Sequence, residues 1–259
     1  MKDFNIYNLR MVAAMQEKLF FLDKIDLKEY DLIVDFGCAT GELIRNIIPV
    51  VRQPGGSPVI ITGFDINEDM LRAARHNIPG EIDNIEIDLC RDLIELEYNL
   101  KYAKKSLIIF SSVMHEMSQT AQRRVITTLM PKFDTVVIRD MKRPLNNEPV
   151  ANITRKRVLS KVAPWQAAMF ESRWGKIKDK ETLYRFFLMN EFVENFESEV
   201  EEDYFGVLWS EIDWQLEDDY KKIYESSYTL PYRKQQVKRV FDHVMHDITH
   251  RKVIYTKNK

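Results

Sequence analysis

The sequence predicts an α/β protein of the doubly wound class, whose mainly parallel sheet carries an antiparallel terminal strand pair and a helical cap insertion. Apolar runs of strand length alternate with helix-like stretches up to residue 141, as expected for consecutive βαβ units. The first run, LIVDF, leads into the small-residue turn GCATG. Turns of this kind form ligand crevices at the carboxyl ends of parallel strands. After residue 141 the chain becomes rich in aromatic and charged residues.

The elements expected before residue 141 follow from apolar periodicity. Residues 4–22 are predicted to form an amphipathic helix, because apolar side chains recur there near helical spacing. Strands are expected at residues 32–36, 59–64, 85–89, 107–110 and 135–138, and helices at about 41–51, 67–77 and 118–130. This alternation predicts a parallel sheet with right-handed crossovers.

The remaining chain is assigned to the cap and to the last strands. Residues 142–230 are predicted to form the helical cap, because the stretch 150–225 contains no convincing strand. Its larger aromatic side chains are expected to pack the cap: Trp165, Phe170, Trp174, Tyr184, Phe186 and Phe187. Residues 231–259 regain an alternation of apolar and polar residues on both sides of Asp247. They are predicted to form the terminal strand pair that completes the sheet.

Composition is that of a globular protein, with 259 residues of which 45% are hydrophobic and 30% charged. No apolar run approaches the length that crosses a bilayer. The N-terminus has no apolar signal-peptide region. We therefore expect a cytoplasmic protein without a membrane partner, whose oligomeric state the sequence leaves open.

Cysteine and histidine spacing predicts no metal site. Cys38 and Cys90 form neither a disulfide framework nor a zinc motif, and are expected to be small packing residues. His243, His246 and His250 have the spacing H-x-x-H-x-x-x-H. On a strand the first two would point to opposite faces, so this spacing does not indicate a metal centre.

Charge is unevenly distributed along a chain of net charge −2. Residues 142–180 hold ten basic and three acidic side chains, and residues 226–259 hold eight and two. Residues 181–225 hold three basic and fourteen acidic side chains. One interpretation is that these are solvated helix faces. The other is that two basic segments flank a site for a negatively charged acceptor.

The turn after the first strand carries a recognisable motif. Residues 35–41, DFGCATG, resemble motif I of class I S-adenosylmethionine (SAM) dependent methyltransferases, written acid-x-Gly-x-Gly-x-Gly, with Ala39 in place of the middle glycine. The G-x-G-x-x-G fingerprint of dinucleotide sites does not fit. The resemblance covers roughly residues 30–141 and the terminal strands. It implies a Rossmann-like SAM-binding core at 30–141, with Asp35, Gly37, Cys38, Ala39 and Gly41 at the cofactor.

Further matches occur in chain order. The second strand ends IITGFDIN, which places Asp65 where the family's acid binds both ribose hydroxyls. A carboxylate suits this position because it accepts two hydrogen bonds. The resemblance also implies that Ile66 packs on the adenine ring.

The third and fourth strands complete the expected cofactor site. The third leads into LCRDL, so that Arg91 and Asp92 fall at the adenine end. Asp92 is expected to accept from the adenine amino group, with Asp88 as the alternative. The fourth strand runs into IIFSSVMHEM, which resembles the segment facing the transferring methyl group and includes Ser111.

The N-terminal residues are expected to cover this site. In this superfamily an N-terminal helix often lies over SAM, and residues 1–29 are assigned that role. Arg10 on this helix is a candidate partner of the cofactor's carboxylate.

Candidate catalytic groups follow from the chemistry of methyl transfer. SAM is already activated as a sulfonium, so the protein mainly aligns the acceptor and excludes water, and a neutral O or N acceptor must also lose a proton. His115 and Glu116, after the fourth strand, and Asp140, at the end of the fifth, are candidate bases. The alternatives are a packing histidine and a carboxylate favoured by a helix dipole.

These features predict a SAM-dependent methyltransferase. Its acceptor is an O or N atom on a small molecule or on an RNA or nucleotide-like anion. The alternative is a SAM-fold binding or sensing module without catalysis.

Overall fold

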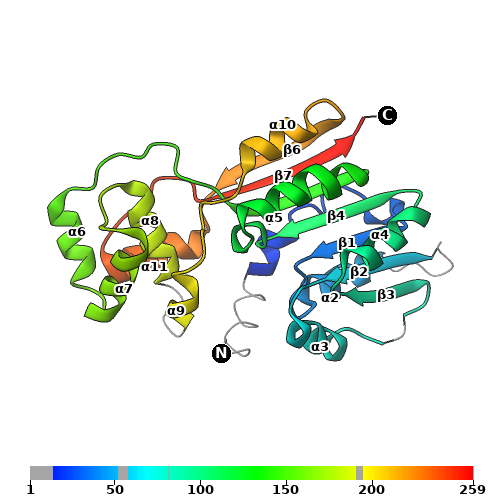
Figure 1. Ribbon diagram of the computed structural model, residues 1–259, viewed down its shortest axis with the longest axis horizontal. Coiled ribbons are helices and arrows are strands. Elements are labelled where there is room, and N and C mark those ends of the chain that lie inside the picture. The colour runs from blue at the N-terminus through cyan, green and yellow to red at the C-terminus, as the bar shows by residue number, and fades with distance from the viewer. Residues whose placement is uncertain (1–13, 52–57, 81, 191–194, 259) are drawn as a thin grey trace. The chain divides into compact units, whose positions relative to one another are not determined.

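The computed structural model describes residues 14–51, 58–80, 82–190 and 195–258. Its sheet has seven strands in the order β3-β2-β1-β4-β5-β7-β6 (Figure 1). The strands are β1 (Leu32–Phe36), β2 (Val59–Phe64), β3 (Ile85–Cys90), β4 (Ser106–Ser111), β5 (Thr135–Met141), β6 (Tyr220–Tyr228) and β7 (His250–Lys257).

The helices divide between the two halves of the chain. The first half contains α2 (Glu42–Val51), α3 (Glu68–Asn77), α4 (Leu93–Tyr102) and α5 (Gln119–Arg124), the last continued by a π-helical turn over Val125–Leu129. The second half contains α6 (Asn152–Leu159), α7 (Pro164–Trp174), α8 (Lys180–Met189), α9 (Phe196–Glu199), α10 (Trp209–Leu216) and α11 (Pro231–Phe241). No helix among the described residues has the length and apolar character needed to cross a membrane.

The first five strands form the parallel part of the sheet. Strands β1, β4 and β5 are buried at every position, as expected where helices cover both faces. In the register, Phe36 of β1 is level with Phe64 of β2 and Phe110 of β4, so the carboxyl ends of these strands form one edge. The strand order reverses between β1 and β4, and ligands of doubly wound sheets bind at such a switch point.

β7 runs antiparallel to β5. The amide of Lys257 donates to the carbonyl of Asp134, and the amide of Lys142 donates to that of Thr249, both at 2.8 Å. Because the residue numbers run in opposite directions between these two bonds, the strands are antiparallel. The antiparallel terminal strand predicted from the sequence is therefore present.

The neighbour of that strand differs from the prediction. β6 lies at 220–228, within the predicted cap, while residues 231–241 form helix α11 instead of a strand. The buried residues of α11 are Arg233, Val237 and Phe241, spaced by four, and Pro231 begins the helix, a position that proline favours. The apolar positions of this stretch therefore follow a helical period and not the alternation expected of a strand.

The helix between β3 and β4 is not predicted by the sequence. Helix α4 buries only Leu96, so its sequence has little apolar periodicity. Its start is nevertheless marked by Asp92, whose carboxylate accepts from the amide of Ile94 at 2.9 Å, as an N-cap residue does.

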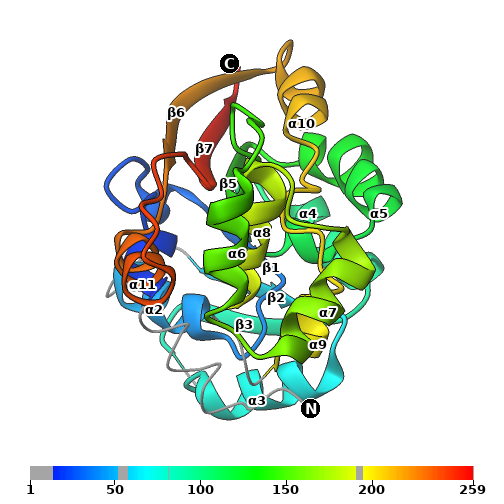
Figure 2. The ribbon, with the colours of Figure 1, turned by 90° about the vertical axis from the view of Figure 1, so that its left-hand side faces the viewer.

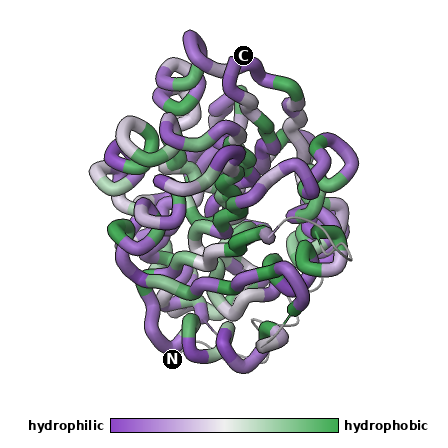
Figure 3. The backbone as a smooth tube through the Cα atoms, turned by 90° about the vertical axis from the view of Figure 1, so that its right-hand side faces the viewer, coloured by the Kyte–Doolittle hydropathy of each residue, from purple (hydrophilic) through white to green (hydrophobic). Residues whose placement is uncertain are grey.

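The described residues form two compact units. The sheet unit comprises residues up to 140 together with 208–226 and 252–258, and the helical unit comprises 141–207 and 227–251. The predicted cap, 142–230, thus loses residues 208–226 to the sheet unit, and the predicted terminal segment, 231–259, contributes most of its length to the helical unit. In Figure 3 the hydrophobic stretches of chain lie mainly inside and the hydrophilic ones outside.

Each unit has its own apolar core. In the helical unit α8 is buried from Leu183 to Met189. Of the aromatic side chains expected to pack the cap, Phe170, Tyr184, Phe186 and Phe187 are buried, whereas Trp165 is 48% exposed. Buried Arg185 lies 3.9 Å from the ring centroid of Trp174 and donates to Asp203 at 2.7 Å, so this arginine is paired within the core.

Candidate functional site

The motif loop at residues 35–41 turns tightly over the end of β2. The amides of Gly37 and Cys38 donate to the carbonyl of Phe64 at 2.8 and 3.0 Å. Gly37 has a φ of 79°, which favours glycine. A Cβ added there would lie 2.4 Å from Cγ2 of Val113. The backbone at Gly37 therefore lies closer to the β4 loop than a side chain permits.

Ala39 and Gly41 complete the loop with positive φ values of 47° and 77°. At Gly41 an added Cβ would lie 2.7 Å from Cδ1 of Ile78. The close packing of the loop against the end of α3 therefore requires glycine at this position. Cys38 and Cys90 are both buried, and burial raises the pKa of each thiol, that of Cys90 to about 12. These thiols are packing residues, as the sequence predicted.

Asp65 follows β2 and connects it to the motif loop. Its Oδ2 accepts from the amide of Ala39 and its Oδ1 from the amide of Asn67, both at 2.9 Å. Each carboxylate oxygen has a second lone pair, so the group can still accept from a ligand. The neighbouring Ile66 is 77% exposed, which leaves an apolar side chain open beside it.

The end of β3 distinguishes the two acids considered there. Asp88 lies inside the strand and accepts from Nδ2 of Asn99 at 2.7 Å. Asp92 lies beyond the carboxyl end of the strand, as the N-cap of α4. Asp92 is therefore at the same edge as Asp65, whereas Asp88 is not. Arg91 is exposed, and its guanidinium lies 4.0 Å from Glu68.

Two oxygens at the ends of β1 and β4 have no hydrogen-bond partner among the described residues. They are Oδ2 of Asp35 and Oγ of Ser111, two buried atoms of residues that are 2% and 7% exposed. Buried polar atoms without a partner are rare and call for an explanation, such as an absent ligand or water. Burial raises the pKa of Asp35 to about 7, although the charge of Lys18 acts in the opposite direction.

Lys18 is a site residue that the sequence did not single out. It is buried, and burial followed by the charge of Arg139 lowers its pKa to about 8, against the opposing effects of Asp35, Glu116 and Asp140. Lys18 stands three residues from Met15 and from Phe21, both buried. That helical spacing was the available signal, because it places a lysine on the apolar face of the segment.

A pair made of His115 and Asp140 joins the ends of β4 and β5. Nδ1 of His115 lies 2.6 Å from Oδ1 of Asp140. The other carboxylate oxygen accepts from the amides of Val113 and Met114 at 3.1 and 2.8 Å. Asp140 is fully buried and His115 is 6% exposed. Asp140 thus holds both the ring and the backbone of the loop that carries it.

The same loop is fixed at its start by Arg139. The amide of Ser112 donates to the carbonyl of Arg139 at 2.8 Å, and the Arg139 guanidinium donates to the Ser112 hydroxyl. Ser112 has a φ of 62°, a strained conformation for a residue other than glycine. Glu116, the other predicted base on this loop, is exposed. Arg10 lies outside the described residues.

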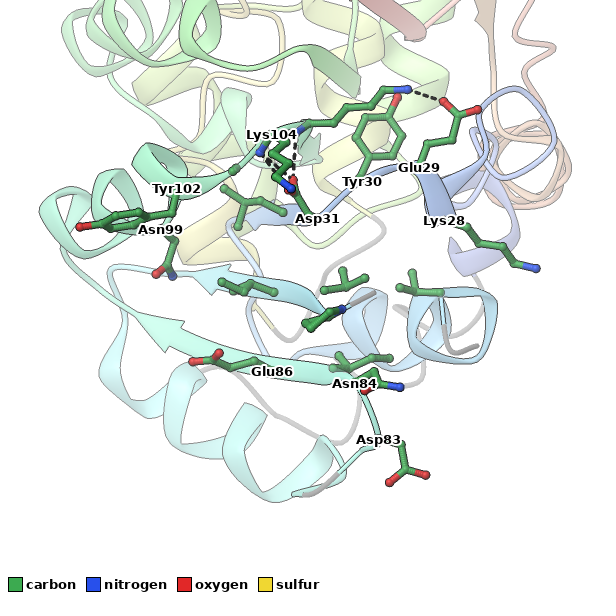
Figure 4. Close-up of a pocket in the computed structure, with 18 residues that line it drawn as sticks. Lys28, Glu29, Tyr30, Asp31, Asp83, Asn84, Glu86, Asn99, Tyr102 and Lys104 are labelled. Carbon is green, nitrogen blue, oxygen red and sulfur yellow. Dashed lines mark hydrogen bonds and ion pairs between the residues drawn. The ribbon is translucent and has the colours of Figure 1, made fainter. Parts of the chain in front are cut away.

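A cavity of about 720 Å³ lies at the opposite edge of the sheet, beside the amino ends of β1, β2 and β3 (Figure 4). Some of its charged groups are paired with one another or with backbone amides. The carboxylate of Asp31 accepts from the amides of Lys104 and Lys105, and the Lys105 ammonium pairs with Glu29. The cavity is therefore separate from the residues of the motif loop.

The buried pair of Lys18 and Asp35 is expected to make the stability of the protein depend on pH. Between pH 3.8 and about 7 the folded chain keeps a proton on Asp35 that the unfolded chain loses, so stability falls as pH rises. Between about pH 8 and 10.5 the unfolded chain keeps a proton on Lys18 that the folded chain loses, so stability recovers.

The double variant Lys18→Met/Asp35→Asn removes both titrations. Its Tm relative to the wild type is expected to be highest between pH 7 and 8 and to decline toward pH 5 and pH 10, measured by thermal denaturation. The exposed pair Lys28→Met/Asp69→Asn is the control. A Tm difference that is flat with pH would contradict the expectation.

Solved structures resemble this chain, although no protein-family model and no curated protein sequence matches it. A SAM-dependent methyltransferase from Anabaena variabilis ATCC 29413 is 11% identical, with a TM-score of 0.55 over 96% of this chain and 85% of that one. A SAM-dependent methyltransferase from Archaeoglobus fulgidus is 14% identical, with a TM-score of 0.52 over 99% of this chain and 100% of that one. The likeness confirms the predicted fold class.

Proposed function

Because the chain has the Rossmann-like fold of class I SAM-dependent methyltransferases, we propose that it binds SAM and transfers its methyl group to an O or N acceptor. The observation that carries the proposal is the set of Asp35, Gly37 and Asp65 at the carboxyl ends of β1 and β2. Asp35 and Gly37 belong to the motif loop, and Asp65 follows the next strand, which is the chain order of the family pattern. The proposal therefore rests on fold and site together.

The residues at this edge fit the cofactor. Asp35 and Ser111 each keep a buried oxygen without a hydrogen-bond partner among the described residues, as expected where a polar ligand is to be bound. Gly37 lacks the side chain that would block the loop. These features would accommodate the amino-acid part of SAM beside a closely approaching backbone.

The nucleoside end of the cofactor has its own candidates. The free lone pairs of Asp65 would accept from the two ribose hydroxyls, and exposed Ile66 would cover one adenine face. Asp92 would accept from the adenine amino group. Exposed Arg91 would line this end, whereas buried Cys38 of the motif loop would pack behind the cofactor site. Arg10 stays a candidate for the carboxylate.

The chemistry divides between cofactor and protein. Bound SAM would supply an activated methyl group, and the residues of this chain would orient the acceptor and remove its proton. His115 is the candidate base. A proton on its Nδ1, donated to Asp140, makes Nε2 the basic nitrogen of the ring.

Asp140 is assigned a different role from the one considered from the sequence. Its two oxygens already accept from two backbone amides and from His115. A carboxylate so occupied orients the imidazole and does not itself take the proton. Asp140 is therefore proposed as a positioning residue, and exposed Glu116 as the alternative base.

Calorimetric titration of SAM into the protein tests the proposal directly. Asp65→Ala is expected to weaken binding by about 1.5–3 kcal/mol, the cost of hydrogen bonds lost from a charged group. Asp69→Ala, an exposed acid on α3, is the matched control and should bind like the wild type. Equal affinities for wild type and Asp65→Ala would exclude the ribose assignment, and absence of SAM binding would exclude the function.

Methyl transfer itself is measured with SAM labelled on its methyl group. The protein is incubated with cell extract separated into RNA, protein and small-molecule fractions, and label in one fraction identifies the acceptor class. If SAM binds but no fraction gains label, the chain is a binding or sensing module instead of an enzyme.

A further inference from the structure

Two helices of the helical unit contain basic side chains but no acidic ones. Residues 152–161, which include α6, read NITRKRVLSK, and α11 reads PYRKQQVKRVF. Neither stretch contains an aspartate or glutamate. Both helices contribute to one apolar core, α6 through Val158 and α11 through Val237 and Phe241. Figure 2 shows both helices in view.

The exposed cations of the two helices converge. Asp242, just after α11, lies 4.0 Å from Arg157 of α6 and pairs with Lys238 of α11. Lys238, Arg157 and Lys161 together hold the pKa of Asp242 below its usual range. One carboxylate thus lies near three cations, of which Arg157 is on α6, Lys161 follows α6 and Lys238 is on α11, and the net charge of this group is positive.

The same cations also act on half-buried His243. Burial lowers the pKa of His243, and the charges of Arg157, His246 and Lys238 lower it further. The exposed cations follow helical spacing: Lys161 lies four residues after Arg157, and Lys234 lies four residues before Lys238.

We propose that this basic surface, defined by Arg157, Lys161, Lys234 and Lys238, binds the phosphate backbone of an RNA. The proposal rests on the proposed function, and it assigns the methyl acceptor to RNA. Cations spread over two helices contact several phosphates at once, which a polymer offers and a single nucleotide does not. An RNA also carries the O and N atoms that the proposed transfer requires.

The test uses fluorescence anisotropy with a labelled single-stranded RNA longer than about 16 nucleotides, which exceeds common single-strand site sizes. Arg157→Gln/Lys161→Gln/Lys238→Gln is expected to weaken binding about tenfold or more, and to make the plot of log affinity against log salt shallower by about 2. Lys28→Gln/Lys101→Gln/Lys104→Gln removes three exposed cations of the sheet unit and is the charge-matched control. It should change affinity by less than about twofold.

Several outcomes would overturn the proposal. They are equal weakening by both triple variants, no RNA binding by the wild type, and binding to phosphatidylserine vesicles without binding to RNA. Thermal denaturation of each variant shows whether it is folded. Titration with SAM separates the two proposals. If the protein does not bind SAM but loses RNA binding only in the surface variant, the RNA-binding surface is supported and the methyltransferase function is excluded.

Discussion

Replacing His115 with asparagine is expected to lower the rate of methyl transfer by about 10²–10⁴-fold, the contribution of a positioned general base. The asparagine amide can still donate a hydrogen bond to Asp140, which His115 approaches to 2.6 Å. The loop therefore keeps its anchor while the basic nitrogen is lost. Single-turnover rates with the acceptor found by labelling measure the effect, and SAM affinity is expected to be unchanged.

Two variants show whether the base has been assigned correctly. Asp140→Asn is expected to lower the rate by about 10²-fold or more, because an amide facing Nδ1 favours the wrong tautomer of the imidazole. Glu116→Gln changes an exposed carboxylate on the same loop and should leave the rate nearly intact. If Glu116→Gln abolishes transfer while His115→Asn does not, the base is Glu116. His76→Asn, an exposed histidine of α3, is the control.

Gly37→Ala is expected to cost about 2–6 kcal/mol of stability and to abolish measurable SAM binding. The φ of 79° strains any side chain, at about 1–3 kcal/mol. The new Cβ would lie 2.4 Å from Val113, and overpacking of this kind costs about 1–3 kcal/mol more. Denaturant unfolding gives the stability, and calorimetry gives the affinity.

The chain offers controls that separate the two costs. Gly175 has a φ of 75° but no neighbour within 4 Å of an added Cβ, and Gly80 has neither a positive φ nor a neighbour. Gly175→Ala should lower stability by the backbone strain alone. Gly80→Ala should show neither the strain nor the overpacking cost. Adding Val113→Ala to Gly37→Ala should recover the part due to overpacking. If Gly37→Ala is no worse than Gly175→Ala, the close approach does not constrain the loop.

Local sequence was sufficient for the parallel half of the fold. β1 and β2 have the predicted bounds, because strands buried on both faces are continuous apolar runs that need no information from distant residues. The positions of the motif loop and of Asp65 could be predicted for a related reason. A tight turn needs glycine at defined positions, and an acid follows directly at a strand end, so both features are visible within a few residues.

Local sequence did not predict the elements correctly where the apolar pattern is weak. β6 is an edge strand with exposed Lys221 and Lys222, so its alternation of apolar and polar residues is weak. The predicted strand at 231–241 is instead helix α11. The sequence also left Asp88 and Asp92 as alternatives, because strand ends are hard to locate from one sequence. The observed end of β3 at Cys90 separates them.

The sequence by itself determined that this chain forms a doubly wound sheet with a motif loop after its first strand and an acid after its second. Only the tertiary structure brought His115 onto Asp140, 25 residues away, and buried Lys18 near Asp35. The physical reason is that apolar periodicity and turn chemistry act over a few residues. The pairing of charged groups depends instead on which strand ends the folded sheet places side by side.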